Sequence, residues 1–263
     1  MASPILSKAR NLMADPLARP RLVLDEQPAD VYAIGDIHGC ISLLLQLEGM
    51  IIEEAKRRST PTLIVYVGDL VDRGPDSRAV IEHCLTSALP DNVERLVLCG
   101  NHDLTFSEFL LEPSLSSPWI NWGGAATLAS YGVDLEDFVA AGLPEGVLSA
   151  WLSDRIPLEH MAFLAHLPTV LSMPSAHIVH AGLRHHASLE EQTERDLMWS
   201  RELFLVDEPA SDRWVVHGHT PFETPEIGPG RIGIDTGAVY GGALTAVHLQ
   251  AETFRFISVP AKG

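Results

Sequence analysis

Residues 31–39 read VYAIGDIHG: an apolar run of the kind found in buried strands ends in Asp36, and His38 follows two positions later. Two later stretches repeat this arrangement, with LIVYVGD ending at Asp69 and RLVLCGN ending at Asn101. Each run is rich in aliphatic residues and stops at a glycine that is followed by a polar side chain. The repetition predicts three buried strands, each with a chemically useful group at its end.

The segments between these runs, 41–58 and 76–89, place apolar residues three and four positions apart, which predicts amphipathic helices. Asp36, Asp69 and Asn101 are separated by 33 and 32 residues, close to the ~30 residues of a strand, a crossover helix and the next strand. Because such crossovers are right-handed and set the strands in parallel, we expect the three side chains at one edge of a sheet. Ligands of open α/β sheets bind at that edge.

The rest of the chain divides by pattern. Residues 1–29 are interrupted by prolines and read as an N-terminal arm, with a short strand suggested at 21–26. Residues 103–168 are helical and loop-like in pattern, which predicts a helical insertion, and alternating strand patterns return from residue 177 onward. We therefore expect a single domain over 30–260, whose second half forms a mostly β layer packed on the first.

The composition excludes several classes of protein. The chain has 263 residues, with 35 acidic against 18 basic side chains and a net charge of −17, which argues against a nuclease or any general nucleic-acid binding protein. Three scattered cysteines predict reduced thiols and no disulfide framework. No apolar run approaches the ~18 residues of a membrane span, and the N-terminal stretch is too polar for a secretory signal. We expect a cytoplasmic protein that binds neither nucleic acid nor membrane.

Glycine-flanked polar residues supply a set of oxygen and nitrogen ligands without sulfur. Any one of them alone is also consistent with a helix cap or a structural histidine. Together they fit a pair of manganese, iron or zinc ions better than a structural zinc. Two such ions ~3.5–4 Å apart would generate a hydroxide that attacks phosphorus in line. The candidate ligands are Asp36, His38, Asp69, Asn101, His180 and His219.

Arg73 lies in the stretch GDLVDRGP, directly after Asp72. An exposed ion pair in this loop would contribute little to stability. The planar guanidinium of arginine suits the bidentate capture of a phosphoryl group better than lysine does. We therefore interpret Arg73 as a ligand of a substrate phosphate.

The ordered motifs GDIHG, GDLVDRG, GNHD, HAG and HGHT, spread over about residues 30–250, resemble those of the calcineurin-like metallophosphoesterases. GDLVDRGP is similar, more narrowly, to the phosphoprotein phosphatase superfamily. The resemblance implies an α/β fold, a β-sandwich of two mixed sheets flanked by helices in four αββα layers, with the helical insertion at about 103–168. It also implies two divalent metal ions per chain, with manganese expected and iron or zinc as alternatives.

The resemblance assigns a role to each candidate residue. The first metal takes the residues that match Asp36, His38 and Asp69. The second metal shares Asp69 and adds those that match Asn101, His180 and His219.

A general acid and several phosphate ligands are also implied. His102 matches the residue that protonates the leaving oxygen, and Asp72 matches the carboxylate paired with it. Trp199 and Arg201 present the W-x-R pattern of a second phosphate arginine. The loop that closes the site corresponds to 235–240. The implied ligands of the substrate phosphate are Arg73, Arg201, Asn101 and Tyr240.

Two features bear on the substrate. Asp103 stands at the position where eukaryotic-type protein phosphatases carry glutamate and bacterial diadenosine tetraphosphatases carry aspartate. Residues 122–132, WGGAATLASYG, resemble a segment common in bacterial serine/threonine phosphatases. The chain also has Asp72, at a position where the tetraphosphatases tend to carry another residue. We expect a phosphomonoester hydrolase acting on phosphoserine or phosphothreonine in proteins, or on small phosphate esters. The alternative is a bis(5'-nucleosyl)-tetraphosphatase. A catalytically silent binding protein is disfavoured because every ligand position is present.

Overall fold

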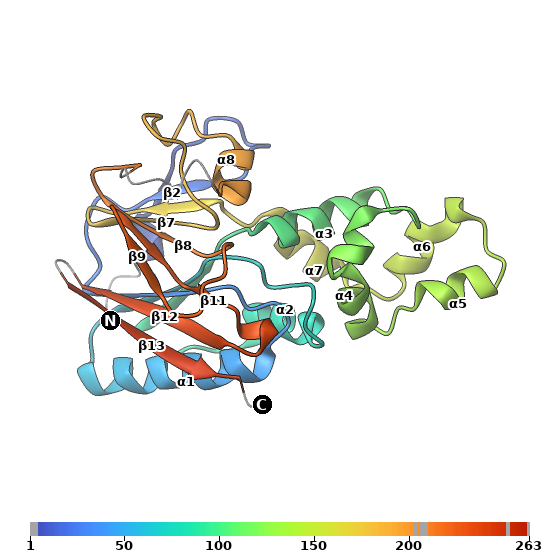
Figure 1. The fold of residues 1–263 in the computed structure, drawn as a ribbon, viewed down its shortest axis with the longest axis horizontal. Helices are drawn as coiled ribbons and strands as arrows, with labels where there is room; N and C mark the ends of the chain where they lie inside the picture. The colour runs from blue at the N-terminus through green and yellow to red at the C-terminus, as the bar shows by residue number, and fades with distance from the viewer. Residues whose placement is uncertain (1–4, 202–204, 206–209, 251–252, 262–263) are drawn as a thin grey trace.

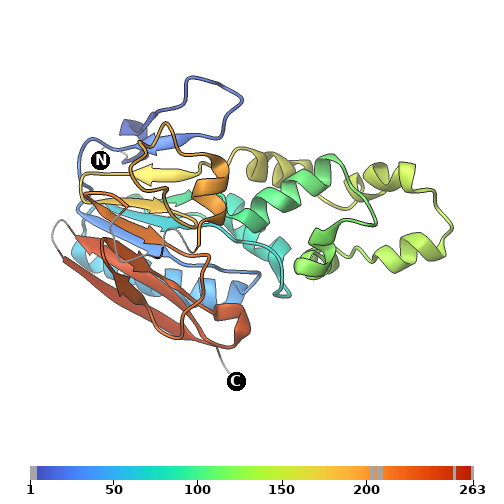
Figure 2. The same ribbon diagram turned by 45° about the horizontal axis from the view of Figure 1, so that its top comes forward.

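The fold consists of two β-sheets stacked face to face, with helices on the outside and a helical arm on one side (Figures 1 and 2). The structure is a computed structural model that describes residues 5–201, 205, 210–250 and 253–261. Residues 1–4 of the predicted N-terminal arm lie outside this range. The stacked arrangement confirms the expected α/β sandwich.

The first sheet contains the three predicted strands, parallel and side by side. In register, Asp30 of the first strand pairs with Thr62 of the second, which pairs with Val93 of the third. The predicted crossover helices are present between them as α1 and α2. The elements are β3 (Asp30–Ile34), α1 (Ile41–Arg58), β4 (Thr62–Tyr66), α2 (Ser77–Thr86) and β5 (Val93–Val97).

Three further strands extend the first sheet at the β3 side. Strand β12 (Ala243–Gln250) pairs antiparallel with β3, and both β11 (Asp235–Thr236) and β13 (Thr253–Pro260) pair antiparallel with β12. The C-terminal strands thus complete the sheet that the N-terminal half begins. The expectation that the second half forms a separate layer is wrong for this part of the chain.

The second sheet has the strand order β1-β2-β6-β7-β8-β10-β9. Its first two strands come from residues 10–23, so the N-terminal arm is built into this sheet, where β2 runs parallel to β6. The strands are β1 (Arg10–Asn11), β2 (Arg21–Val23), β6 (Val170–Ser172), β7 (Ala176–Val179), β8 (Trp214–His217), β9 (Glu226–Gly228) and β10 (Arg231–Gly233).

Alternation along β3 and β4 divides the apolar residues between two cores. Val31 and Leu63 face the second sheet and pack with Ile178 in the layer between the sheets. Their neighbours Tyr32 and Ile64 belong to the core under the helices. Since successive side chains of a strand point to opposite faces, both faces of β3 and β4 are buried. This burial fixes the strands whose ends carry the polar residues.

The predicted insertion forms a helical arm that projects from the sandwich (Figure 1). It begins with the helix that follows β5 and returns to the second sheet before β6. None of the helices in the described ranges is long and apolar enough to cross a membrane. The helices are α3 (Asn101–Leu111), α4 (Gly124–Ser130), α5 (Leu135–Ala140), α6 (Leu148–Ser153) and α7 (Leu158–Ala165), with 3₁₀ turns at Pro118–Trp122 and Glu145–Val147.

Candidate metal centre

The candidate site lies in the turns at the carboxyl edge of the first sheet, where the backbone is held in unusual conformations. In the described part of the chain, seven non-glycine residues have a positive φ angle. Such a conformation is uncommon for side chains with a Cβ and clusters at functional sites. Five of the seven belong to the predicted site: His38, Asp69, Asp72, Arg73 and His219.

Glycine allows the turns of the site to approach one another. A Cβ atom on Gly218 would lie 2.0 Å from Oδ1 of Asp36, and no side chain fits at that distance. The missing Cβ lets the backbone N–H of His219 donate to both carboxylate oxygens of Asp36, at 3.1 Å each. The glycine of the HGHT motif thus brings two predicted ligands together.

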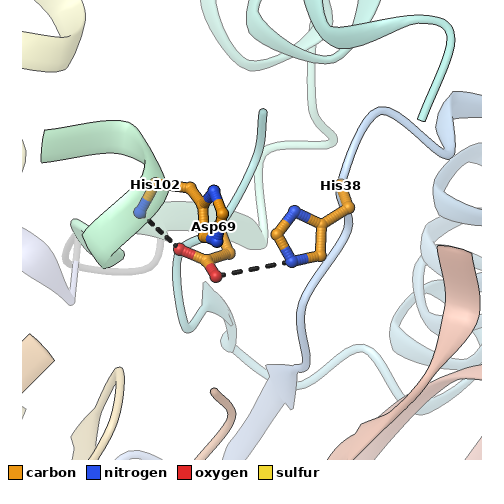
Figure 3. A group of neighbouring side chains, drawn as sticks. All are labelled: His38, Asp69 and His102. Atoms are coloured by element: carbon orange, nitrogen blue, oxygen red, sulfur yellow. Dashed lines mark hydrogen bonds and ion pairs between the residues drawn. The ribbon is translucent and has the colours of Figure 1, made fainter. Parts of the chain in front are cut away.

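Asp69 lies at the middle of the cluster. Its Oδ2 is 3.4 Å from Nε2 of His38, and its Oδ1 is 3.4 Å from Nε2 of His180. Figure 3 shows its carboxylate turned toward His38, with the backbone N–H of His102 donating to the other oxygen at 3.0 Å. One carboxylate therefore faces two groups of imidazoles, as a shared ligand would.

Asn101 links His180 and His219 to each other. Its Oδ1 lies 2.9 Å from Nε2 of His180 and 2.8 Å from Nδ1 of His219. Asp36 contacts the backbone of His219, as described above. The structure thus brings all six predicted ligands together from segments that are up to 183 residues apart.

The imidazoles are held in the form that binds metal ions. The carbonyl oxygens of Val71 and Val67 can only accept hydrogen bonds, so Nδ1 of His38 donates at 2.7 Å and Nδ1 of His180 at 3.1 Å. Their Nε2 atoms are then the unprotonated nitrogens, which face Asp69. Burial lowers the pKa of His38 to about 3 and is also the largest cause of the lowered pKa of His180. Both shifts favour the neutral form of the ring.

Buried carboxylates at the site call for a positive counter-charge. Asp36 and Asp69 are nearly inaccessible, and Asp235 of β11 is also buried. Burial, followed by the charges of Asp235 and Asp69, raises the pKa of Asp36 well above its ordinary value. Two groups of three residues each offer potential ligand atoms that lie within 4.8 Å of one another inside the group. One group is His38, Asp69 and His102, and the other is Asp69, His180 and His219. Neutral imidazoles around crowded carboxylates fit two divalent cations.

His102 and Asp72 form a buried hydrogen-bonded pair. Nδ1 of His102 lies 2.6 Å from Oδ2 of Asp72, which is fully buried. Trp119 Nε1 donates to the same oxygen at 2.8 Å, and Thr127 Oγ1 donates to the other at 2.7 Å. Burial alone would lower the pKa of His102, but the charge of Asp69 and the hydrogen bond and charge of Asp72 together raise it. The protonated imidazolium is favoured, as a general acid requires.

The residues that hold this pair differ in how far the sequence points to them. Thr127 lies in the segment 122–132, which resembles a segment of bacterial serine/threonine phosphatases. Trp119 lies outside every motif, and no pattern linked it to Asp72, 47 residues away in the chain. The sequence pattern places Asp235 only in a closing loop, whereas in the structure its charge contributes to the raised pKa of Asp36.

Two arginines lie against the cluster. The guanidinium of Arg73 donates to Nε2 of His38 and lies beside Nε2 of His102, with 2.8 Å between the two nitrogen atoms, and it lies 5.6 Å from the centre of the Tyr240 ring. Nε of Arg201 donates to Nε2 of His219 at 3.0 Å. The three predicted phosphate-binding side chains outside the ligand set, Arg73, Arg201 and Tyr240, therefore lie at or beside the candidate centre.

A cavity of about 630 Å³ opens beside His219. Its wall is formed largely by α8 (Glu194–Trp199), the short helix that precedes Arg201. The indole of Trp199 stands edge-on to the ring of His219, with 6.4 Å between ring centres. The cavity is lined by Leu104, Glu194, Arg195, Trp199, Arg201 and His219.

Asp103 ties two of the site's turns together. Its fully buried carboxylate accepts from the backbone N–H of Leu70 and of Gly100, both at 2.9 Å. In an Asp103→Asn variant one N–H would face an amide NH₂, and an unsatisfied buried group costs about 1–3 kcal/mol. We expect a loss of that size in the free energy of unfolding, measured with urea. An unchanged midpoint and slope would contradict this role.

Three histidines left without a function in the sequence have structural partners. His83 contacts Glu48 at 2.6 Å, His248 contacts Asp30 at 2.7 Å, and His160 contacts Tyr131 at 2.8 Å. Each is a buried or half-buried link between elements of the core. None of them adds to the metal cluster.

Comparison with known proteins identifies the family of this chain. The calcineurin-like phosphoesterase family matches residues 29–242. A bis(5'-nucleosyl)-tetraphosphatase (asymmetrical) of Halalkalibacterium halodurans is 29% identical over 253 residues, covering 87% of this chain and 93% of that protein. Serine/threonine-protein phosphatase 1 of Salmonella typhimurium is 30% identical over 239 residues, covering 84% and 92%.

Solved structures show the same fold. A crystal structure provisionally assigned as a diadenosine tetraphosphatase superposes with a TM-score of 0.60 at 23% identity, covering 91% of this chain and 97% of that one. A cold-active protein tyrosine phosphatase of a psychrophilic Shewanella superposes with a TM-score of 0.55 at 14% identity, covering 90% and 82%. At these identities the likeness concerns the fold alone.

Proposed function

This chain belongs to the calcineurin-like phosphoesterase family and is a phosphoesterase, and we propose that it hydrolyses phosphoserine and phosphothreonine esters with the help of two divalent metal ions. The observation that carries this proposal is the buried pair of His102 and Asp72, 2.6 Å apart. The alkoxide of serine or threonine is a strongly basic leaving group and has to be protonated as it departs. A histidine kept protonated at the site meets that need.

The proposed metal ligands are the six side chains described above. Their oxygen and neutral nitrogen donors suit manganese, with iron or zinc as alternatives. Two such cations would supply Lewis acidity at the phosphoryl oxygens and a water made reactive at neutral pH. Asp69, which faces both groups of ligands, is the proposed shared ligand.

The chain's own cationic groups bind and orient the phosphate. Arg73 and Arg201 approach the cluster from His38 and from His219, so their guanidinium groups can neutralise different oxygens of one phosphate. Tyr240, under Arg73, keeps that guanidinium in place. His102 gives its Nε2 proton to the leaving oxygen, and Asp72 holds the imidazole through Nδ1.

A second candidate is the hydrolysis of dinucleoside polyphosphates. It is favoured by the relatives that carry the name bis(5'-nucleosyl)-tetraphosphatase at 27–29% identity, such as the Halalkalibacterium protein at 29%. A phosphate leaving group is much less basic than an alkoxide, so it depends less on a general acid. The two candidates therefore differ in how much His102 should matter.

The test compares the two substrate classes directly. We expect kcat/KM on a phosphoserine peptide to exceed that on diadenosine tetraphosphate, each measured with and without added Mn²⁺. Turnover of the nucleotide alone would replace the proposed function with the second candidate. A protein that cleaves neither substrate when loaded with Mn²⁺ would contradict both.

Arg73→Lys should weaken substrate binding. A charge-assisted hydrogen bond contributes roughly 1.5–3 kcal/mol, so losing one of the two contacts of a bidentate guanidinium should lower kcat/KM by roughly 10- to 100-fold. Steady-state kinetics on p-nitrophenyl phosphate measures this. Arg57→Lys, on the exposed face of α1, is the matched control and should retain full activity. Equal kcat/KM in both variants would contradict the role of Arg73 in binding the substrate phosphate.

A further inference from the structure

Arg21 of strand β2 reaches from the N-terminal arm into a distant loop. The residue is 5% exposed. Its guanidinium donates to the backbone carbonyls of Leu189, Glu190 (3.1 Å) and Gln192 (2.5 Å). Three carbonyls converge on the planar fork of N–H donors that one guanidinium presents. A lysine cannot reproduce this arrangement, because its ammonium group is a compact point charge.

The same loop is fastened from inside by Gln192. Its Oε1 accepts from the backbone N–H of Arg184 at 2.7 Å, and its Nε2 donates to the carbonyls of Arg184 at 2.9 Å and Ala187 at 3.2 Å. Gln192 is itself 2% exposed. The segment 184–192 is therefore a closed loop, and Arg21 anchors the end at which it leaves for α8.

Parts of the candidate active site are attached to both ends of this loop. His180 precedes it, and Thr193, whose side chain caps the N-terminus of α8, follows it directly. Helix α8 forms the wall of the cavity beside His219, and Arg201 comes two residues after Trp199. The backbone N–H of Ala181 donates to the carbonyl of Leu197 at 2.8 Å, so the two ends lie side by side.

We infer that Arg21 is a positioning residue for the substrate side of the active site: it holds the loop 184–192, and through it α8 and Arg201, in place. The inference rests on the proposed function in one respect, the phosphate-binding role of Arg201. The N-terminal arm thereby supports the active site, although its described residues, from 5 onward, contribute no side chain to the metal cluster.

The structure offers a matched control two residues away. Arg19 also reaches from the arm to backbone carbonyls, those of Leu164 (2.8 Å) and Leu167 (3.3 Å). These carbonyls belong to the end of α7 and the connection to β6 and not to the loop. Arg19→Ala therefore removes a contact of the same kind from the same arm without releasing α8.

The test compares Arg21→Lys, Arg21→Ala and Arg19→Ala with the unaltered chain. Displacing a binding group by about 1 Å can cost roughly 100-fold in rate. We expect KM for p-nitrophenyl phosphate to rise by roughly 10- to 100-fold in both Arg21 variants, with a smaller change in kcat, and to stay unchanged in Arg19→Ala. Added guanidinium should partly restore the KM of Arg21→Ala, which a merely destabilised protein would not show.

Hydrogen exchange, measured without metal or substrate, gives a readout that does not depend on activity. Peptides from 184–201 should exchange faster in the Arg21 variants, while peptides from β3 and β4 stay protected. The inference is overturned if Arg21→Lys, which keeps the positive charge, leaves both the KM and the exchange of 184–201 unchanged. It is equally overturned if exchange rises throughout the chain, because Arg21 would then support the whole fold.

Arg201→Ala separates failure of the inference from failure of the proposed function. If Arg201→Ala raises KM and the Arg21 variants do not, the inference is wrong and the phosphate-binding role stands. If Arg201→Ala leaves KM unchanged, the role proposed for Arg201 is wrong, and the exchange of 184–201 alone then decides whether Arg21 holds the loop.

Discussion

Asp69→Asn should reduce phosphoesterase activity by more than about a thousandfold and reduce the metal content of the purified chain. The reason is that Asp69 is the one carboxylate found in both groups of metal-ligand atoms among the described residues. Loss of a residue that only supports a ligand already costs roughly 10- to 100-fold in metal affinity, and a ligand shared by two cations should cost more. Kinetics on p-nitrophenyl phosphate and elemental analysis of the same sample measure both effects.

Asp91→Asn is the control for this variant. Asp91 is exposed in the connection between α2 and β5, so its loss should alter neither activity nor metal content. Circular dichroism shows whether Asp69→Asn keeps the fold. A folded Asp69→Asn protein with wild-type activity would show that Asp69 is not a shared ligand.

His102→Ala should lower kcat on a phosphoserine peptide by roughly 10²- to 10⁴-fold, the usual contribution of a general acid. The same variant should lose much less activity on p-nitrophenyl phosphate, whose weakly basic leaving group departs without a proton. The structural reason is the imidazole held by Asp72 and turned toward Arg73, with its pKa raised by Asp69 and Asp72. The measurement compares the loss of kcat in His102→Ala on the phosphoserine peptide with its loss on p-nitrophenyl phosphate, both in one buffer.

His166→Ala serves as the matched histidine control. Its ring is exposed at the end of α7, where Nδ1 lies 2.7 Å from the carbonyl oxygen of Ala162, so both substrates should be turned over normally. An equal loss on the two substrates in His102→Ala would mean that His102 acts through binding or through the metal cluster. General-acid catalysis by this residue would then be rejected.

Local patterns predicted the elements that carry the first half of the site. The apolar spacing of residues 41–58 gave the bounds of α1, and the three apolar runs gave β3, β4 and β5 in parallel. These elements are buried on both faces or amphipathic, so their composition reflects their environment directly. The polar residues at the strand ends follow from that geometry.

Long-range pairing could not be read from local pattern. An alternating strand such as 243–250 pairs equally well with either sheet by its own composition, and its place beside β3 depends on the whole topology. The same holds for β2, whose three residues join β6 from the far end of the chain. The hydrogen bond from Trp119 to Asp72 depends on how the helical arm folds back, which no spacing encodes.

The histidines of the site were identified because their motifs combine glycine with a strand end, which is a local feature. His180 follows β7 directly, His219 follows β8 after a single glycine, and the structure places both beside Asn101. The residues that hold the loop 184–192, Gln192 and Arg21, lie in no motif. Their role appears only when the backbone carbonyls they contact are brought together in space.

Metal analysis of the purified, folded chain tests the central claim most directly. After dialysis against Mn²⁺ and removal of the excess, we predict close to two ions per chain in the unaltered protein, and markedly fewer in Asp69→Asn. A folded, unaltered chain that retains almost no divalent metal would contradict the account.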